Sequence, residues 1–213
     1  MSARYVEFPN IGILEVTLSD EELAPIWQEV NKIQQNFNIG VEYNNKLAGN
    51  IAKEYRLFES AEYINGLVFH YLKEYDNISG HVTKADFLTS NLPLIIPEPW
   101  VNFQAKYEFN PPHIHSGIAS FVIWLKIPYN IKDELSSESS AKSYEPLAGH
   151  FTFQYTNTLG QIRPYNIPAD KSMENKMLIF PAELTHSVHP FYTSDEHRIS
   201  VSGNVKFLNQ QDK

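Results

Sequence analysis

The sequence predicts a mainly β protein with helices at its amino-terminal end, an α+β chain whose strands form a sandwich or jelly roll. Aromatic residues, which favour strands, make up 13% of the chain, with 12 Tyr and 13 Phe. From about residue 92 onward, six or seven short apolar segments are separated by turns rich in Gly, Asn and Pro. Both helical patterns precede these segments, and this order argues against a parallel doubly wound sheet.

A chain of 213 residues can bury one sizeable core. We therefore expect a single domain over residues 1–213. Its helical amino-terminal region, 1–92, would pack on a β core at 93–208. We find no internal repeat at the periods of solenoid proteins.

The amino-terminal region begins with a predicted strand at Ile11–Leu18. Ser19, followed three residues later by Glu22, forms a capping-box pattern that predicts the start of a helix running to about Phe37. Pro25 lies in the second turn and predicts a kink or a later start. The buried stripe of this helix would comprise Leu23, Ile26, Trp27, Val30 and Ile33.

A second helix is predicted from about Ser60 to Tyr75, and the turn residues 77–80 end it. Residues 38–55, which precede it, are polar and show no clear period. The buried stripe of this second helix would comprise Ile64, Leu67, Val68, Tyr71 and Leu72.

The β core is predicted from apolar segments bounded by turns. The segment Ala119–Ile127 is nearly continuous in apolar residues, which indicates a central strand covered on both faces. A β-hairpin is predicted around the turn 157–160. The Ser- and Glu-rich stretch Lys132–Tyr144 predicts a flexible loop, which could close over a site as a lid. The predicted strands lie at 101–109, 119–127, 151–156, 161–167, 176–181, 185–191 and 198–208.

The candidate metal site is His113-Ile114-His115. If the strand that begins near Val101 continues through Pro112, both imidazoles project to one face, because side chains at i and i+2 share a face. Two imidazoles on one face are two ligands of a first-row metal. The third is expected from His186, which follows an apolar strand and a turn.

The third corner of this site has two interpretations. Mononuclear iron sites usually combine two histidines with one carboxylate, but Asp and Glu are absent between Phe109 and Trp124. In the interpretation we favour, His115 fills that corner as a third imidazole. In the other, His115 is the first ligand and Gly117 holds the carboxylate position, which leaves the corner to water or an anion. Histidine pairs on strands also occur without any metal.

Arg198 is the candidate anchor for a carboxylate-bearing co-substrate, because a planar guanidinium binds a carboxylate bidentately. Ser200 lies two residues along the same predicted strand face and can donate a further hydrogen bond. The alternative is a surface ion pair of Arg198 with Asp195 or Glu196. Alternation along the strand at 101–109 suggests further polar groups that face the co-substrate, namely Asn102, Gln104 and Tyr107.

Composition excludes several other classes of site. The formal net charge of −8 argues against a nucleic-acid-binding surface. The absence of cysteine excludes disulfides, thiolate metal sites and Cys nucleophiles. The first residues do not resemble a signal peptide, and no apolar run approaches the roughly 20 residues that span a bilayer. We expect a soluble cytoplasmic protein with no membrane partner.

Three segments together resemble a known family. They are Pro111–Gly117, Leu178–His186 and Arg198–Asn204, within a region from about Trp100 to Val205. This region resembles the 2-oxoglutarate/Fe(II)-dependent oxygenases common in marine cyanobacterial phages. The resemblance implies a double-stranded β-helix (a cupin-like jelly roll), an Fe(II) centre, 2-oxoglutarate and O2 as co-substrates, and, for a phage protein, the cytoplasm of the host cell.

The resemblance also implies roles for individual residues. His113 and His186 match the triad histidines, Arg198 matches the residue that binds the distal carboxylate of 2-oxoglutarate, and Ser200 matches its hydrogen-bonding neighbour. At His115 the sequence departs from the wider superfamily, in which Asp is usual. The implied reaction is oxidative decarboxylation of 2-oxoglutarate coupled to hydroxylation of a C–H bond.

Two other functions compete with this one. A three-His dioxygenase of cupin type would need no 2-oxoglutarate, and His115 motivates this alternative. A non-enzymatic jelly-roll binding or virion protein would keep the fold without the chemistry. The sequence does not identify the prime substrate, which could be a protein side chain, a peptide or a small molecule, and it leaves homo-oligomerisation open.

Overall fold

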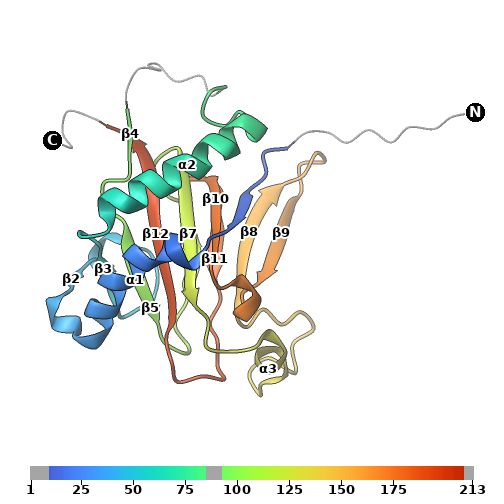
Figure 1. The fold of residues 1–213 in the computed structure, drawn as a ribbon. Coiled ribbons are helices and arrows are strands. Elements are labelled where there is room, and N and C mark those ends of the chain that lie inside the picture. Colours follow the sequence, from blue (N-terminus) through green and yellow to red (C-terminus); the bar gives the residue numbers. More distant parts are fainter. Residues whose placement is uncertain (1–9, 85–92, 209–213) are drawn as a thin grey trace, which may run out of the picture.

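Two antiparallel sheets face each other in the computed structural model, which describes residues 10–84 and 93–208 (Figure 1). The larger sheet has the order β1-β10-β7-β12-β5-β3-β2, with β4 also paired to β12, and the smaller has the order β6-β11-β8-β9. This arrangement confirms the mainly β class. The larger sheet contains β1 (Leu14–Thr17), β2 (Val41–Glu42), β3 (Glu54–Arg56), β4 (Leu94–Ile95), β5 (Trp100–Gln104), β7 (Ala119–Lys126), β10 (Lys176–Pro181) and β12 (Arg198–Phe207); the smaller contains β6 (Asn110–His113), β8 (His150–Thr156), β9 (Ile162–Pro168) and β11 (His186–Val188).

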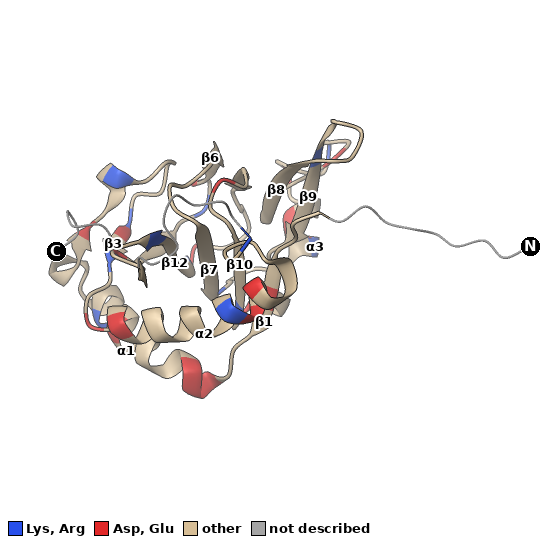
Figure 2. Cartoon of the chain, turned by 90° about the horizontal axis from the view of Figure 1, so that it is seen from above, with Lys and Arg blue, Asp and Glu red and all other residues tan. Residues whose placement is uncertain are grey.

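Two long helices, α1 (Asp20–Gln35) and α2 (Ala61–Ser79), cover the face of the larger sheet that points away from the smaller sheet (Figure 2). The predicted capping box at the start of α1 is confirmed, because Ser19 Oγ accepts from the Glu22 N–H and Glu22 Oε2 accepts from the Ser19 N–H. The helix includes Pro25, so the later start that this proline suggested is wrong. The remaining helical segments are α3 (Ile131–Ser136) and short 3-10 turns at Phe37–Ile39, Asn44–Lys46 and Lys171–Met173. None of the described helices has the length and apolar character that crossing a membrane requires.

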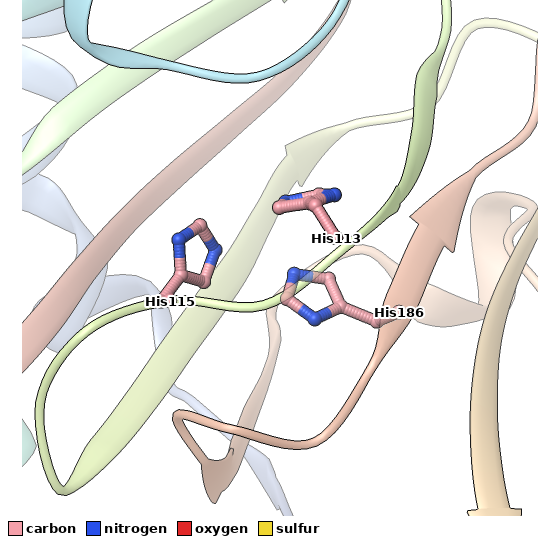
Figure 3. A group of neighbouring side chains, drawn as sticks. All are labelled: His113, His115 and His186. Carbon is pink, nitrogen blue, oxygen red and sulfur yellow. The ribbon is translucent and has the colours of Figure 1, made fainter.

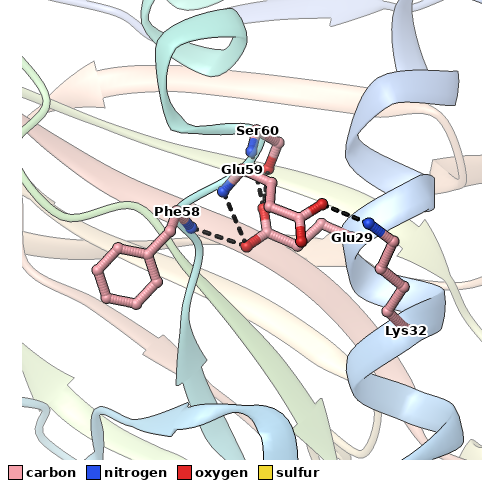
Figure 4. A network of polar contacts seen from close by, with 5 residues as sticks. All are labelled: Glu29, Lys32, Phe58, Glu59 and Ser60. Atoms are coloured by element: carbon pink, nitrogen blue, oxygen red, sulfur yellow. Dashed lines mark hydrogen bonds and ion pairs between the residues drawn. The ribbon is translucent and has the colours of Figure 1, made fainter.

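Glu29 joins the two long helices (Figure 4). Its side chain is buried, with 6% exposed, and it accepts hydrogen bonds from the backbone N–H groups of Phe58, Glu59 and Ser60 at 2.7–3.1 Å and from the Ser60 hydroxyl at 2.6 Å. These N–H groups precede α2, where a negative charge is favoured. The sequence pattern did not identify this residue: it placed Trp27 on the buried stripe of α1, whereas Trp27 is only half-buried and Glu29 lies inside.

Two apolar cores lie on the two faces of the larger sheet, and the central strand β7 serves both. Phe121 and Ile123 point toward the helices, whereas Val122 and Trp124 point toward the smaller sheet. All residues of β7 except the last are buried. The prediction of a central strand covered on both faces is therefore confirmed.

The strand predicted at 101–109, with its continuation through Pro112, is wrong. β5 ends at Gln104, a turn follows, and β6 belongs to the other sheet. Two local features explain the break. The Glu108 carboxylate accepts from the Ala105 N–H at 2.8 Å and closes the turn, and Tyr107 has a φ of 70° that a strand does not allow.

The flexible loop predicted at 132–144 is also corrected. Its first residues belong to α3, and the buried Glu134 of that helix accepts from the N–H groups of Tyr192 and Thr193 at 2.7 and 2.9 Å. This carboxylate ties α3 to the segment that follows β11. No residue of 132–144 lines the central cavity described below, so the geometry gives no support to a lid.

The described part of the amino-terminal region contributes three strands as well as two helices. β1, β2 and β3 all belong to the larger sheet, and α1 and α2 pack on it. The division of a single domain at residue 92 stays a prediction. The proposed boundary adjoins residues 85–92, which lie outside the described residues, as do 1–9 and 209–213.

Candidate metal and co-substrate site

Three histidines meet in a cavity between the two sheets (Figure 3). His113, the last residue of β6, lies opposite His186, the first residue of β11, in the antiparallel register. His115 follows the end of β6, where its N–H donates to the Ala182 carbonyl at 2.9 Å. The cross-strand pair of His113 and His186, with His115 just after β6, therefore brings the rings together. The predicted alternation along one strand does not.

The three rings point toward one another. Their centroids are 4.3 Å apart for His113 and His186 and 4.9 Å for each pair that includes His115. One nitrogen from each ring lies within 4.8 Å of the other two, a spacing at which a single metal ion can be bound. Among the described residues, this group contains imidazoles only, without a carboxylate.

Backbone carbonyls orient two of these imidazoles, and burial keeps two of them neutral, so that their ring nitrogens can bind a metal. Nδ1 of His113 lies 2.8 Å from the Pro111 carbonyl, and Nδ1 of His186 lies 2.9 Å from the Leu184 carbonyl. A proton on each Nδ1 satisfies the carbonyl and leaves Nε2 free for a metal. Burial, with a smaller contribution from His113, lowers the pKa of His186 to about 3 and that of His115 to about 4. Both rings are neutral at pH 7, so this donor set fits Fe(II).

Position 117 lies apart from the three rings. Gly117 has a φ of 125°, and a Cβ there would lie 2.5 Å from the Val205 carbonyl oxygen. A side chain at this position would be strained and would meet β12, outside the cavity lining. The fold thus brings His115, and not position 117, to the other two histidines.

Arg198 lies in the same cavity, 3% exposed. Its Nε donates to Gln104 Oε1 at 3.0 Å and its Nη1 to the Tyr129 hydroxyl at 2.6 Å. The surface ion-pair alternative is wrong, because Asp195 and Glu196 pair with Lys106 and Lys126 instead. No ion pair within residues 10–84 and 93–208 includes Arg198, so the cavity holds a buried cation without a counter-ion.

A row of polar side chains runs beside Arg198 on the inner face of the larger sheet. Gln104 lies opposite Arg198, and Asn102 lies opposite Ser200. Ser200 Oγ accepts from Asn102 Nδ2 at 3.2 Å, which leaves the hydroxyl proton of Ser200 available to a ligand. Asn102, Gln104 and Ser200 line the cavity as alternation suggested. Tyr107 does not: it lies in the turn after β5, 61% exposed.

Sequence reasoning missed two residues of this cavity and its surroundings. Tyr129 stacks on Phe191 at 4.7 Å and accepts from Arg198. Burial raises the pKa of Tyr129, so the phenol stays protonated. Glu54 of β3 also lines the cavity. No sequence motif around Tyr129 indicated its role. Glu54 lies in the polar stretch 38–55, where the sequence shows no clear hydrophobic period.

The comparison with protein families gives one match. The model of a family described as "Putative 2OG-Fe(II) oxygenase" matches residues 98–204, just over half of the chain. This range contains the three histidines, Arg198 and Ser200. A search of curated proteins finds no match.

Solved structures share the fold. A prolyl-4-hydroxylase from Pseudomonas putida is 12% identical, with a TM-score of 0.55 over 93% of this chain and 94% of that one. A Trichoplax adhaerens prolyl hydroxylase, in complex with a peptide fragment of the hypoxia inducible factor oxygen degradation domain, is 13% identical, with a TM-score of 0.55 over 95% and 86%. A Burkholderia pseudomallei oxidoreductase of the 2OG-Fe(II) oxygenase family is 14% identical, with a TM-score of 0.50 over 92% and 84%.

These likenesses confirm the predicted double-stranded β-helix, since the matches extend over nearly the whole chain at low identity. The family match extends over the segment that carries the histidines and the buried arginine. The chain belongs to the 2OG-Fe(II) oxygenase family, whose members are hydroxylase-like enzymes that use Fe(II), 2-oxoglutarate and O2.

Proposed function

We propose that this oxygenase hydroxylates a C–H bond of its prime substrate, with Fe(II) held by His113, His115 and His186 and 2-oxoglutarate anchored by Arg198. The observation that carries the proposal is the shared cavity: three converging imidazoles and a buried guanidinium, which has no counter-ion among the described residues, face the same space. The first group suits a divalent metal, and the second suits a carboxylate.

Each side chain has a separate task in this proposal. The histidines orient the metal, which when bound supplies the O2-dependent oxidation coupled to decarboxylation of 2-oxoglutarate. Arg198 binds the distal carboxylate through its fork of N–H groups, and Ser200 donates one further hydrogen bond to it. Gln104 and Tyr129 accept from the guanidinium and hold it in place.

Apolar side chains on the inner faces of both sheets form part of the wall of this site, beside the row of polar groups. Val122, Trp124 and Phe180 of the larger sheet and Phe151 of the smaller sheet line the cavity and are buried. In such surroundings a carboxylate–guanidinium pair is stronger than it would be in water.

The test measures Fe(II)-dependent conversion of 2-oxoglutarate to succinate, after anaerobic metal loading and without added prime substrate. We expect turnover in the wild type and none in His186→Ala, because the variant loses one of three ligands. His70→Ala, an exposed position on α2, is the matched control and should retain wild-type turnover. Equal turnover in all three proteins would contradict the assignment of His186.

His115 motivates a second candidate, a three-His dioxygenase that uses O2 without 2-oxoglutarate. The third imidazole leaves the metal site one negative charge poorer than the usual set of two histidines and one carboxylate. O2 consumption that requires Fe(II) but is unchanged by omitting 2-oxoglutarate would favour this candidate. The buried cation Arg198 argues for the 2-oxoglutarate enzyme.

We also propose a phage source and action in the cytoplasm of the infected host, on the strength of the three segments that resemble phage oxygenases. Sequencing the genomic neighbourhood of the coding region tests the source: adjacent phage structural genes are expected, and a bacterial operon would contradict it. A peptide or small molecule is the proposed prime substrate, since the net charge of −8 disfavours nucleic acid.

A further inference from the structure

A second wall of the central cavity comes from the segment that leads into β3. Four residues of this segment line the cavity: Leu47, Ala48, Ile51 and Glu54. Ala48 is exposed and Leu47 is half-buried, whereas Ile51 and Glu54 are only 6% and 4% exposed. This wall therefore combines apolar side chains with one buried carboxyl group.

Glu54 lies on the same sheet face as the proposed co-substrate anchor. In the antiparallel register, Glu54 is opposite Asn102 of β5, and Asn102 is opposite Ser200 of β12. Two strand spacings separate Glu54 from Ser200, which amounts to about 10 Å. This distance places Glu54 beside the proposed co-substrate position rather than in it.

The Glu54 carboxyl has an unused hydrogen-bonding position. Its Oε1 is buried and has no partner among the described residues, and its Oε2 accepts only from Asn44 Nδ2 at 3.3 Å. Buried polar atoms in folded proteins nearly always have a partner. An unpartnered carboxyl oxygen in the lining of a cavity is therefore suited to receive a ligand.

Charges around Glu54 favour a cation at that position. Arg56, two residues after Glu54 in β3, pairs with Glu98 at 3.2 Å, and Lys46 pairs with the same carboxylate. Burial, followed by the charge of Glu108, raises the pKa of Glu54 to about 8. Glu108 itself binds two backbone N–H groups and has no ion pair among the described residues. A ligand cation would stabilise the ionised form of Glu54, which burial and the charge of Glu108 disfavour.

We propose that Glu54 binds a primary ammonium group at the end of an aliphatic stem of the prime substrate, with the stem packed against Leu47 and Ile51. This inference rests on the proposed function, because it assigns a substrate class to that site. At pH 7 the neutral carboxyl group of Glu54 would release its proton to solvent as the ammonium group binds, so that the bound pair consists of one carboxylate and one cation.

The first test uses n-pentylammonium and its uncharged counterpart 1-pentanol as probes. Each is titrated calorimetrically into the anaerobic wild-type protein loaded with Fe(II) and 2-oxoglutarate, at pH 7 in two buffers of different ionisation enthalpy. We expect the ammonium to bind about tenfold or more tightly than the alcohol, since hydrogen bonds to a charged group are the stronger ones. The difference between the buffers should correspond to release of about one proton.

The second test compares Glu54→Gln with Glu62→Gln, an exposed position on α2. Glu54→Gln should lose the preference for the ammonium and release no proton, whereas Glu62→Gln should match the wild type. Equal binding of both probes by the wild type, no binding of either, or an unchanged preference in Glu54→Gln would overturn the inference. If Glu54→Gln does not fold, the comparison of the two probes on the wild-type protein still tests the inference.

Failure of this inference is distinguishable from failure of the proposed function. Succinate formation by the wild type without any amine tests the iron and 2-oxoglutarate chemistry alone. Turnover without ammonium binding would remove the role of Glu54 and leave the oxygenase intact. Ammonium binding without turnover would contradict the proposed function and leave a cation-binding cavity.

Discussion

Replacing Arg198 by Met should weaken binding of 2-oxoglutarate while leaving binding of a keto acid without a distal carboxylate unchanged. Arg198 is 3% exposed and its guanidinium forms no ion pair within the described residues, so a bound carboxylate would be its only counter-ion. Removing one partner of such a buried pair costs about 3 kcal/mol. At about 1.4 kcal/mol per factor of ten, the affinity for 2-oxoglutarate should fall by roughly 100-fold.

The stability of the ligand-free variant should change much less. Loss of a buried charge without a counter-ion favours the folded state. Gln104 Oε1 and the Tyr129 hydroxyl each lose a donor, which costs about 1–3 kcal/mol per group. Because these effects oppose each other, we expect the melting temperature without ligand to stay close to that of the wild type, while the increase produced by 2-oxoglutarate disappears.

The assay is calorimetric titration of 2-oxoglutarate and of 2-oxopentanoate into metal-loaded, anaerobic protein. These two acids share the keto and proximal carboxylate groups and differ in the distal carboxylate. The ratio of their affinities should exceed roughly 100 in the wild type and approach one in Arg198→Met. An equal loss for both acids would mean that the variant distorts the site, and an unchanged ratio would refute the role of Arg198.

Three further changes test the metal site, the helix junction and the buried acid. His115→Asp should retain Fe(II) binding in equilibrium dialysis, whereas His115→Ala should lose about tenfold or more, because only the first variant keeps three donors. Glu29→Ala should lower the free energy of unfolding in urea by about 3 kcal/mol or more, since four hydrogen bonds to a buried carboxylate are lost. The exposed Glu59→Ala, which removes the ion pair with Lys32, should cost at most about 1 kcal/mol. The folded-state pKa of Glu54, about 8, lies above its usual value of 4.5, so stability should fall between pH 4.5 and 8. In Glu54→Gln the free energy of unfolding should decrease less as the pH rises, by about 3 kcal/mol less at pH 7. Urea titrations at several pH values measure this free energy, and an equal dependence on pH in the two proteins would contradict the burial of this carboxyl group.

Local patterns predicted most of the secondary structure because the deciding interactions lie within a few residues. The capping box at Ser19 and Glu22 involves residues three apart, and the strand 176–181 matches β10 in both bounds. The end of β5 could not be predicted in this way. It depends on Glu108, whose carboxylate also accepts from Ala52, more than 50 residues away in the chain.

In the site too, the residue types were predictable from the sequence, whereas features that depend on tertiary packing were not. The sequence singled out His113, His115 and His186, and the structure brings them together; their role as iron ligands stays a prediction. The expected geometry was wrong, because His115 lies beyond the end of β6 rather than on a continuous strand. Tyr129 and Glu54 were missed since only tertiary packing places a phenol beside Arg198 and a carboxyl group in the cavity.

The strand that carries His113 is also an outer edge of its sheet. The smaller sheet has the order β6-β11-β8-β9, so within residues 10–84 and 93–208 β6 and β9 each have one unpaired side. β6 contains Pro111 and Pro112, and β9 contains Pro164 and Pro168. Proline has no N–H to offer an incoming strand, so both borders resist edge-to-edge association and fibril growth. A peptide substrate could therefore not add a continuous, fully hydrogen-bonded strand along either border of the smaller sheet.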